Sequence, residues 1–296
     1  MANLKSLRTR IGSIKSTQKI TAAMKLVAGV KFRKSEEEAR GGRHYADALR
    51  ESIEYLCSCG NSLEKKYPLL TGQAKIIRSM TIVVYASDKG LCGSFNDRVA
   101  KEAVSRIQSF LTTGVRVNAV CIGTKIMNYL RKRLPEIRVD GYPSNFFSQT
   151  DNLKSFSKQL LARFYANDLD QIFLLYNHFY SAINAELRFV QAVPAISSLQ
   201  DKKSAAADAV SRQIPFFGTS EERFVTALAE HNFLLQLRQA GKESIACENS
   251  TRMTAMDNAT KNAQDMVEKL VLTYNRTRQA VVTGELIEII SGAEAL

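Results

Sequence analysis

The residues with the clearest chemical potential lie in SDKGLCGSFN, residues 87–96, directly after the apolar run TIVVYA. α/β proteins place ligands in such loops, and glycine-rich loops can bring backbone N–H groups to a phosphate. Yet Gly90 and Gly93 form only G-x-x-G, and neither G-x-x-x-x-G-K-[ST] nor G-x-G-x-x-G occurs. The loop therefore favours a tight strand-to-helix turn, with Asn96 or Asp97 as the helix cap, over nucleotide binding.

Other titratable residues do not form a catalytic group. Asp88 and Lys89 are a charged pair in this loop, and we expect them to be solvated rather than catalytic. His178 ends an apolar run, and we expect a loop histidine with satisfied hydrogen bonds rather than a base. G-x-S-x-G and H-E-x-x-H are both absent from the sequence. We therefore predict no catalytic residue.

The cysteines do not predict a metal site. They are odd in number, at 5, and Cys57 and Cys59 form C-x-C rather than C-x-x-C. The chain has only 3 histidines to complete a site. This pattern favours reduced thiols in a cytoplasmic protein, and it predicts neither a metal nor a cofactor.

The net charge of +12 predicts an acidic partner, which can be nucleic acid, an anionic membrane surface or an acidic protein surface. The stretch GSIKSTQKITAAMKLVAGVKFRKS, residues 12–35, contains no acidic residue. A basic coiled-coil protein that binds nucleic acid is therefore one hypothesis, although the stretch lacks interleaved aromatics. No apolar run reaches the length of about 20 residues that a membrane span needs. We expect no signal peptide, because no apolar core follows Lys5, Arg8 and Arg10.

The first element is a predicted long helix within residues 1–60, since residues 3–58 contain no proline. Small or apolar residues recur there with the 3,4 spacing of a coiled coil. This N-terminal seam comprises Leu4, Leu7, Ile11, Ile14, Gln18, Thr21, Lys25, Ala28 and Phe32. Its middle is polar, and Gly41 with Gly42 is expected to be a weak point in the helix.

Residues 76–217 predict an α/β domain. Short β-branched runs begin near residues 80, 115, 137, 171 and 187, and helix-like pieces separate most of them. This alternation indicates a parallel or mixed sheet covered by helices, a Rossmann-like arrangement. RQIPFFG, residues 212–218, is expected to add an edge strand.

Residues 219–296 predict a second long helix, opened by a capping box of Thr219 and Glu222. A helix of about 70 residues would be on the order of 100 Å long, which a compact domain of this size does not bury. We expect the two terminal helices to pair as a slim, long antiparallel coiled coil. The C-terminal seam comprises Met253, Met256, Thr260, Ala263, Val267, Leu270, Tyr274, Thr277 and Val281.

Three stretches resemble the gamma subunit of F-type ATP synthases, bacterial type. LKSLRTRIGSIKSTQKITAAMKLVAGVKFRKS is similar to the family's opening helix, and SDKGLCGSFN to its glycine loop. ENSTRMTAMDNATKNAQDMVEKLVLTYNRTRQAVVTGELIEIISGAEAL is similar to its C-terminal helix. Because this opening follows Met1 directly, we expect no organelle presequence and a bacterial origin.

The resemblance implies a central-stalk rotor without chemistry or a cofactor of its own. Its implied partners are the alpha/beta subunit ring, the epsilon subunit and the membrane c-ring, with no nucleic acid and no small-molecule substrate. Its implied place is peripheral, on the cytoplasmic face of the bacterial inner membrane. It would pass torque from the proton-driven c-ring to the catalytic beta subunits.

The resemblance also carries over individual residues. Matches to the family's beta-subunit contacts are Met24, Lys25, Arg252, Gln279, Thr283 and Glu285. Gly90, Cys92 and Gly93 match its structural glycine loop. The chain departs from the family at TGEL, where Gly284 replaces the usual glutamine of TQEL. This glycine removes a side chain and is expected to soften the helix.

Overall fold

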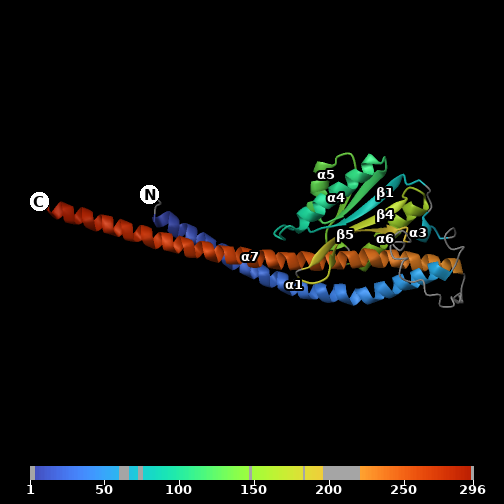
Figure 1. The fold of residues 1–296 in the computed structure, drawn as a ribbon, viewed down its shortest axis with the longest axis horizontal. Coiled ribbons are helices and arrows are strands. Elements are labelled where there is room, and N and C mark those ends of the chain that lie inside the picture. Colours follow the sequence, from blue (N-terminus) through green and yellow to red (C-terminus); the bar gives the residue numbers. More distant parts are fainter. Residues whose placement is uncertain are drawn as a thin grey trace. The chain divides into compact units, whose positions relative to one another are not determined.

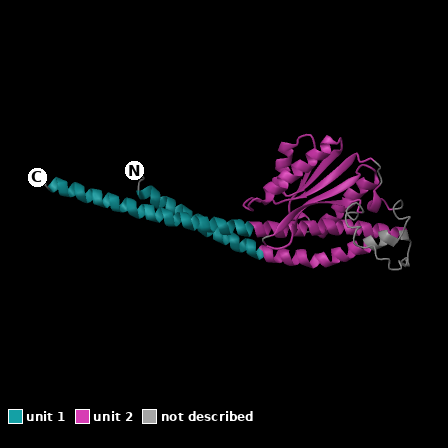
Figure 2. Ribbon diagram, in the orientation of Figure 1, with its two compact units in different colours: residues 1–30, 252–296 teal, residues 31–251 magenta. Residues whose placement is uncertain are grey.

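The computed structural model describes residues 4–59, 67–72, 76–146, 149–182, 184–195 and 221–294. The chain divides into two compact units, which Figure 2 colours separately: residues 1–30 with 252–296, and residues 31–251. Two long helices, α1 (Leu4–Cys59) and α7 (Glu221–Glu294), each contribute to both units. The expected edge strand at 212–218 and the expected cap Thr219 lie outside the described residues.

The unit of residues 31–251 is built around a mixed five-stranded sheet, as the sequence predicts. The strands are β1 (Ser79–Tyr85), β2 (Arg116–Ile122), β3 (Arg138–Tyr142), β4 (Gln171–Phe179) and β5 (Ala185–Val193). Their order is β3-β2-β1-β4-β5, and only the β4–β5 pair is antiparallel. All seven residues of β1 are buried because the strand is central and covered on both faces.

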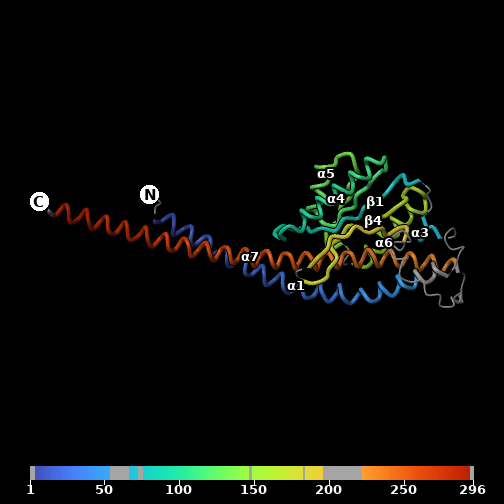
Figure 3. Tube along the Cα trace, in the orientation of Figure 1, coloured from blue at the N-terminus to red at the C-terminus, as the bar shows by residue number. Residues whose placement is uncertain are grey.

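Helices cover both faces of this sheet, and Figure 1 shows α4 and α5 on one face with α6 and α7 along the other. The helices between strands are α4 (Phe95–Thr112), α5 (Thr124–Arg133) and α6 (Thr150–Tyr165), and a short α3 (Pro68–Thr71) precedes β1. Alternate residues of β1 point to opposite faces. Ile82 and Val84 pack with α4 and α5, whereas Val83 and Tyr85 pack with α6 and α7. Figure 3 traces this order along the chain.

The glycine pair of α1 does not interrupt the helix, which runs continuously through Gly41 and Gly42. A Cβ atom at Gly42 would lie 2.6 Å from Oε1 of Gln239 on α7. The expected weak point is therefore a place of close approach between the two helices. On either side of it, Phe32, Ala39 and Leu49 of α1 are buried in this unit's core.

The other unit, residues 1–30 with 252–296, is an antiparallel pair of helix segments. Gly29 faces Met253, Lys25 binds Asp257, and Thr21 accepts a hydrogen bond from Thr260. Residue numbers therefore fall along α1 as they rise along α7, so the two segments run antiparallel. Both predicted seams are confirmed, because every one of their residues is buried or half-buried. Glycine, threonine and alanine at the contacts keep the pair slim.

Candidate functional site

The glycine loop is held by its own side chains. Asn96 accepts a hydrogen bond from Ser87 N–H at 3.1 Å, and its amide nitrogen lies 2.8 Å from Ser87 Oγ and 3.3 Å from the buried Cys92 Sγ. The expectation that Asn96 or Asp97 caps α4 is wrong, since Ser94 is the N-cap residue and makes no side-chain cap bond. Gly93 adopts a φ of 57°, which favours glycine at this tight turn.

Asp88 is a structural anchor rather than a solvated loop charge, which corrects the sequence expectation. Its carboxylate accepts hydrogen bonds from Thr124 N–H at 2.9 Å, Ser144 N–H at 2.9 Å and Ser144 Oγ at 2.6 Å. Burial alone would raise the pKa of Asp88, but the bonds from Ser144 and Thr124 lower it below its ordinary value. The carboxylate thereby ties the loops that follow β1 and β3 to the start of α5, which follows β2.

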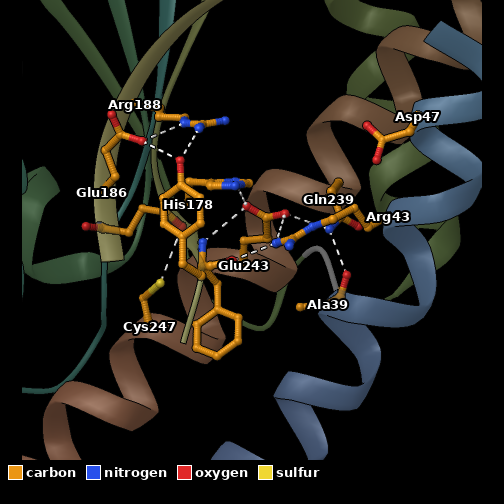
Figure 4. A network of polar contacts seen from close by, with 12 residues as sticks. Ala39, Arg43, Asp47, His178, Glu186, Arg188, Gln239, Glu243 and Cys247 are labelled. Atoms are coloured by element: carbon orange, nitrogen blue, oxygen red, sulfur yellow. Dashed lines mark hydrogen bonds and ion pairs between the residues drawn. The ribbon is translucent and has the colours of Figure 1, made fainter. Parts of the chain in front are cut away.

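A buried polar group joins α1, β4 and α7 (Figure 4). We call Arg43, His178, Gln239 and Glu243 the Glu243 clamp. Glu243, with a side chain only 3% exposed, accepts from Arg43 at 3.0 Å and Gln239 at 2.8 Å through Oε1. Its Oε2 lies 2.5 Å from His178 Nδ1. His178 lies in strand β4 and not in a loop, which corrects the sequence expectation. Its ring is hydrogen-bonded, as the sequence analysis expected.

The clamp also reaches the backbone of two elements. Arg43 donates to the carbonyl of Phe179 at 2.7 Å, and Gln239 donates to the carbonyl of Ala39 at 2.8 Å. Every member of the clamp thus bridges at least two elements of the unit. A buried charge is stable only with such partners, so the clamp fixes the two helices against the sheet.

The protonation of His178 follows from its surroundings. Burial lowers its pKa below 6.5, although Glu243 partly opposes this by favouring the charged form. The lowered pKa favours the neutral ring, in which the contact with Glu243 is a hydrogen bond rather than a full ion pair. Because a carboxylate can only accept, Nδ1 carries the hydrogen. Burial and Glu243 together raise the pKa of the neighbouring Tyr176 to about 12.

The expected partner contacts fall into two groups along the helix-pair unit. Met24, Lys25 and Arg252 are half-buried near the pairing of α1 with α7. Gln279, Thr283 and Glu285 are exposed, and more than 25 residues of α7 separate them from Arg252. At 1.5 Å per residue this separation is about 40 Å.

Lys25 has an internal partner that the sequence did not reveal. Its ammonium lies 2.6 Å from Oδ1 of Asp257, whose other oxygen lies 3.0 Å from Lys261. The hydrogen bond from Lys25, followed by that from Lys261, lowers the pKa of Asp257. Lys25 nevertheless keeps 44% of its side chain exposed, so it remains accessible to a further acidic group.

The helix-pair unit also exposes large apolar side chains. Those that are 48–72% exposed are Ile20, Leu26, Val27, Val30, Met266, Leu272, Val282, Leu286, Ile287, Ile289 and Ile290. Exposed apolar surface of this extent is typical of a protein–protein interface. Among the helices that the structure describes, none has the continuous apolar stretch that a transmembrane span requires.

Paired terminal helices with exposed apolar side chains and a firmly anchored α/β unit are typical of a protein that works by binding partners. Within the described residues, no three histidine, cysteine or acidic side chains are placed to hold a metal ion. The family model described as ATP synthase matches residues 3–296. The chain therefore belongs to the ATP synthase family, and its curated relatives are gamma chains of that enzyme.

These relatives match the whole chain. The gamma chain of Granulibacter bethesdensis is 40% identical over 308 residues and covers 100% of both chains. That of Magnetococcus marinus is 38% identical over 299 residues, covering 100% of this chain and 99% of its own. Neither relative supports the alternative of a nucleic-acid-binding protein.

Solved structures agree on the fold. A chain in the Euglena gracilis mitochondrial ATP synthase has a TM-score of 0.67 and 18% identity, covering 99% of this chain and 94% of that one. A chain in the Tetrahymena thermophila mitochondrial ATP synthase, in a structure of the central stalk and c-ring, has a TM-score of 0.57 and 25% identity. It covers 81% of this chain and 99% of that one.

Proposed function

We propose that this chain is the central-stalk rotor subunit of an F-type ATP synthase, and that it transmits torque from a proton-driven c-ring to catalytic beta subunits. The observation that carries the proposal is the 40% identity to a gamma chain along the full length of both chains. The partners are the alpha/beta ring, the epsilon subunit and the c-ring. The chain contributes no catalytic site and needs no cofactor. It acts peripherally, at the cytoplasmic face of a bacterial inner membrane.

The two helical termini, 1–60 and 219–296, act as one functional part in this proposal, and residues 76–217 act as the other. A rotor inside a ring must not dock too strongly on one subunit, because each step would have to break that contact. The rotor needs contacts of moderate strength that can pass from one subunit to the next. Half-polar seams, a basic surface on α1 and scattered apolar side chains are suited to such contacts. Acidic loops on successive beta subunits would attract residues such as Lys15, Lys19 and Lys31 in turn.

The Glu243 clamp has a mechanical role in this proposal. Torque applied to the α/β part reaches the helices through the contacts between them. The clamp adds directed hydrogen bonds among α1, β4 and α7, whereas apolar packing alone resists sliding less specifically. It therefore supports coupling without touching the catalytic subunits.

The proposed contacts with the beta subunits are Met24, Lys25, Arg252, Gln279, Thr283 and Glu285. Met24, Lys25 and Arg252 would meet one level of the ring, and the three exposed residues of α7 a second level. Asp257 would hold Lys25 in place between encounters with the beta subunits. Because a surface ion pair has a small net energy, an acidic loop could compete with Asp257 for Lys25.

Reconstitution with purified alpha and beta subunits of the same organism tests the proposal. We expect one copy of the chain to join a six-membered ring and ATP hydrolysis to rise sharply, measured by native mass spectrometry and by phosphate release. A chain that stays free, with unchanged hydrolysis, would overturn the proposal. Salt-dependent binding of the free chain to duplex DNA, lost on neutralising Lys15, Lys19 and Lys31, would then favour the nucleic-acid alternative.

A further inference from the structure

A cavity of about 480 Å³ lies within the unit of residues 31–251. Tyr85 and Ala86 at the end of β1, Ile122 at the end of β2 and Ser144 after β3 line one side. Segments of α1 and α7 line the other side. The cavity is thus at the carboxyl edge of the parallel strands, where open α/β sheets bind ligands, and its volume suits a small molecule. The glycine loop contributes none of its Gly90–Gly93 residues to it.

Three cationic side chains line this cavity: Lys34 of α1 and Arg238 of α7, which are exposed, and Lys242 of α7, which is half-buried. None of the three forms an ion pair with a carboxylate elsewhere in the described residues. Lys242 donates instead to the backbone carbonyl of Glu38 at 3.2 Å. Burial, and then the charge of Arg238, lower the pKa of Lys242. A bound anion would offset both effects, because it favours the charged form of Lys242.

The remaining lining sets the shape of the ligand. The hydroxyl of Tyr85 is occupied, since it donates to the carbonyl of Leu237 at 2.8 Å, and the residue is only 2% exposed, so only a small part of its apolar ring borders the cavity. Gly241 allows α7 to pass close to that ring, because a Cβ atom there would lie 3.3 Å from Tyr85 Cε1. Ile122 extends the apolar side. The cavity therefore combines a cationic rim with an apolar wall.

Two carboxylates, Glu38 and Glu248, also line the cavity and limit how tightly it can bind an anion. Glu38 is one helical turn from Lys34, and its charge opposes a phosphate at the rim. Substitutions that remove a cation and substitutions that remove a carboxylate should therefore have opposite effects on anion affinity. Removing a cation should weaken binding, and removing Glu38 should strengthen it.

We propose that this cavity binds a phosphate-bearing small molecule of nucleotide size. Lys34, Arg238 and Lys242 hold its phosphate groups, and Tyr85 with Ile122 contacts its flat, apolar part. Because α1, α7 and the sheet all contribute, the ligand braces these elements against one another and acts as an effector without any reaction. The inference goes beyond the stalk function and does not depend on it, since binding is measured on the chain alone.

Calorimetric titration of the full chain with ADP, pyrophosphate and adenosine tests the inference. We expect one saturable ADP site per chain, weaker binding of pyrophosphate and none of adenosine. Arg238→Gln and Lys242→Gln should each weaken ADP about tenfold, equivalent to about 1.4 kcal/mol. Glu38→Gln should tighten it a few-fold, and Lys132→Gln, an exposed cation on α5, is the matched control and should change nothing.

Thermal unfolding followed by circular dichroism checks that each variant is folded. Hydrogen exchange provides an independent measurement, in which ADP should slow exchange across residues 238–245. Absence of saturable ADP binding overturns the inference, as does binding that the Arg238 and Lys242 variants leave unchanged. Pyrophosphate bound as tightly as ADP would overturn the role of the apolar wall, and adenosine bound as tightly as ADP would overturn the role of the cations.

Discussion

Glu243 links α1, β4 and α7 through one buried carboxylate. Its carboxylate accepts from Arg43, Gln239 and His178, and the N–H of Phe179 is 3.4 Å away. A buried carboxylate without these donors would be strongly destabilising. The stability of the α/β unit therefore depends on charge as well as on apolar packing.

Glu243→Ala should lower the free energy of unfolding by about 3 kcal/mol, because it leaves Arg43 without its carboxylate. Urea unfolding measures this change, and Glu288→Ala on the exposed part of α7 is the matched control. Arg43→Ala combined with Glu243→Ala should cost less than the two single changes added together, by about 1 kcal/mol or more. Strict additivity would show that the two side chains do not act as a pair.

His178 should make stability depend on pH. Its folded pKa lies below 6.5, so the unfolded chain binds the proton more readily and stability falls as pH drops below about 6.5. Above that pH the contribution is fully present. His178→Gln should flatten the dependence between pH 6.5 and 5, measured by urea unfolding at each pH. The carboxylates of Asp88 and Asp257 act in a lower range, since their pKa values are lowered from 3.8. An equal slope in variant and wild type would contradict this prediction.

Individual polar contacts were the least predictable from sequence. Asp88 and His178 were expected to be a solvated charge and a loop histidine, because their partners Ser144 and Glu243 are 56 and 65 residues away along the chain. No local sequence pattern indicates a contact between residues that are so far apart along the chain. A signal was nevertheless present in α7, where Gln239, Glu243 and Cys247 recur at spacings of four and so share one helix face.

At the scale of elements, the hydrophobic period predicted the helices and strands well, because it depends only on residues that are neighbours in the sequence. All five strand runs and both seams are confirmed, including the polar seam members Thr21, Lys25 and Thr260. The cap of α4 was missed because Asn96 bonds back to Ser87 instead. The predicted long helix runs through Gly41 and Gly42, and the close approach of Gly42 to Gln239 of α7 was not predictable from local propensity.

Gly284→Gln should stabilise the end of α7. No atom lies within 4 Å of a Cβ at this position, so a side chain fits without strain, and replacing glycine in a helix gains up to about 1 kcal/mol. Hydrogen exchange should slow across residues 280–290. Gly12→Gln on α1, also open within 4 Å, is a control that should leave residues 280–290 unchanged. Exchange that stays equal or quickens at 280–290 would show that Gly284 does not soften the helix.

At the scale of the whole molecule, deletion of residues 287–296 should leave assembly with alpha and beta subunits largely intact. The described residues of this segment are exposed and form no seam, whereas the paired seams end earlier on α7. Native mass spectrometry of the reconstituted complex measures this outcome. Deletion of residues 253–296 removes the pairing itself and serves as the contrasting variant. Loss of all alpha and beta binding in the shorter deletion would contradict the prediction.

The three-part layout was predictable from proline placement and from the change of hydrophobic period along the chain. The cavity beside Lys242 was not, because it is made by residues from α1, three strand ends and α7 that meet only after folding. Sequence spacing therefore gave the elements, whereas the sites that depend on several elements required the structure.

The pairing of residues 1–30 with residues 252–296 sets an order of events on the ribosome. The first helix segment emerges early, but its partner is made only after residues 31–251. At about 5–20 residues per second this delay is roughly 10 to 45 s. During that time Leu7 and Ile11 lack their native neighbours, so the nascent chain presents an apolar stripe that a chaperone can hold. The subunit can therefore complete its helix pair only after synthesis is almost finished.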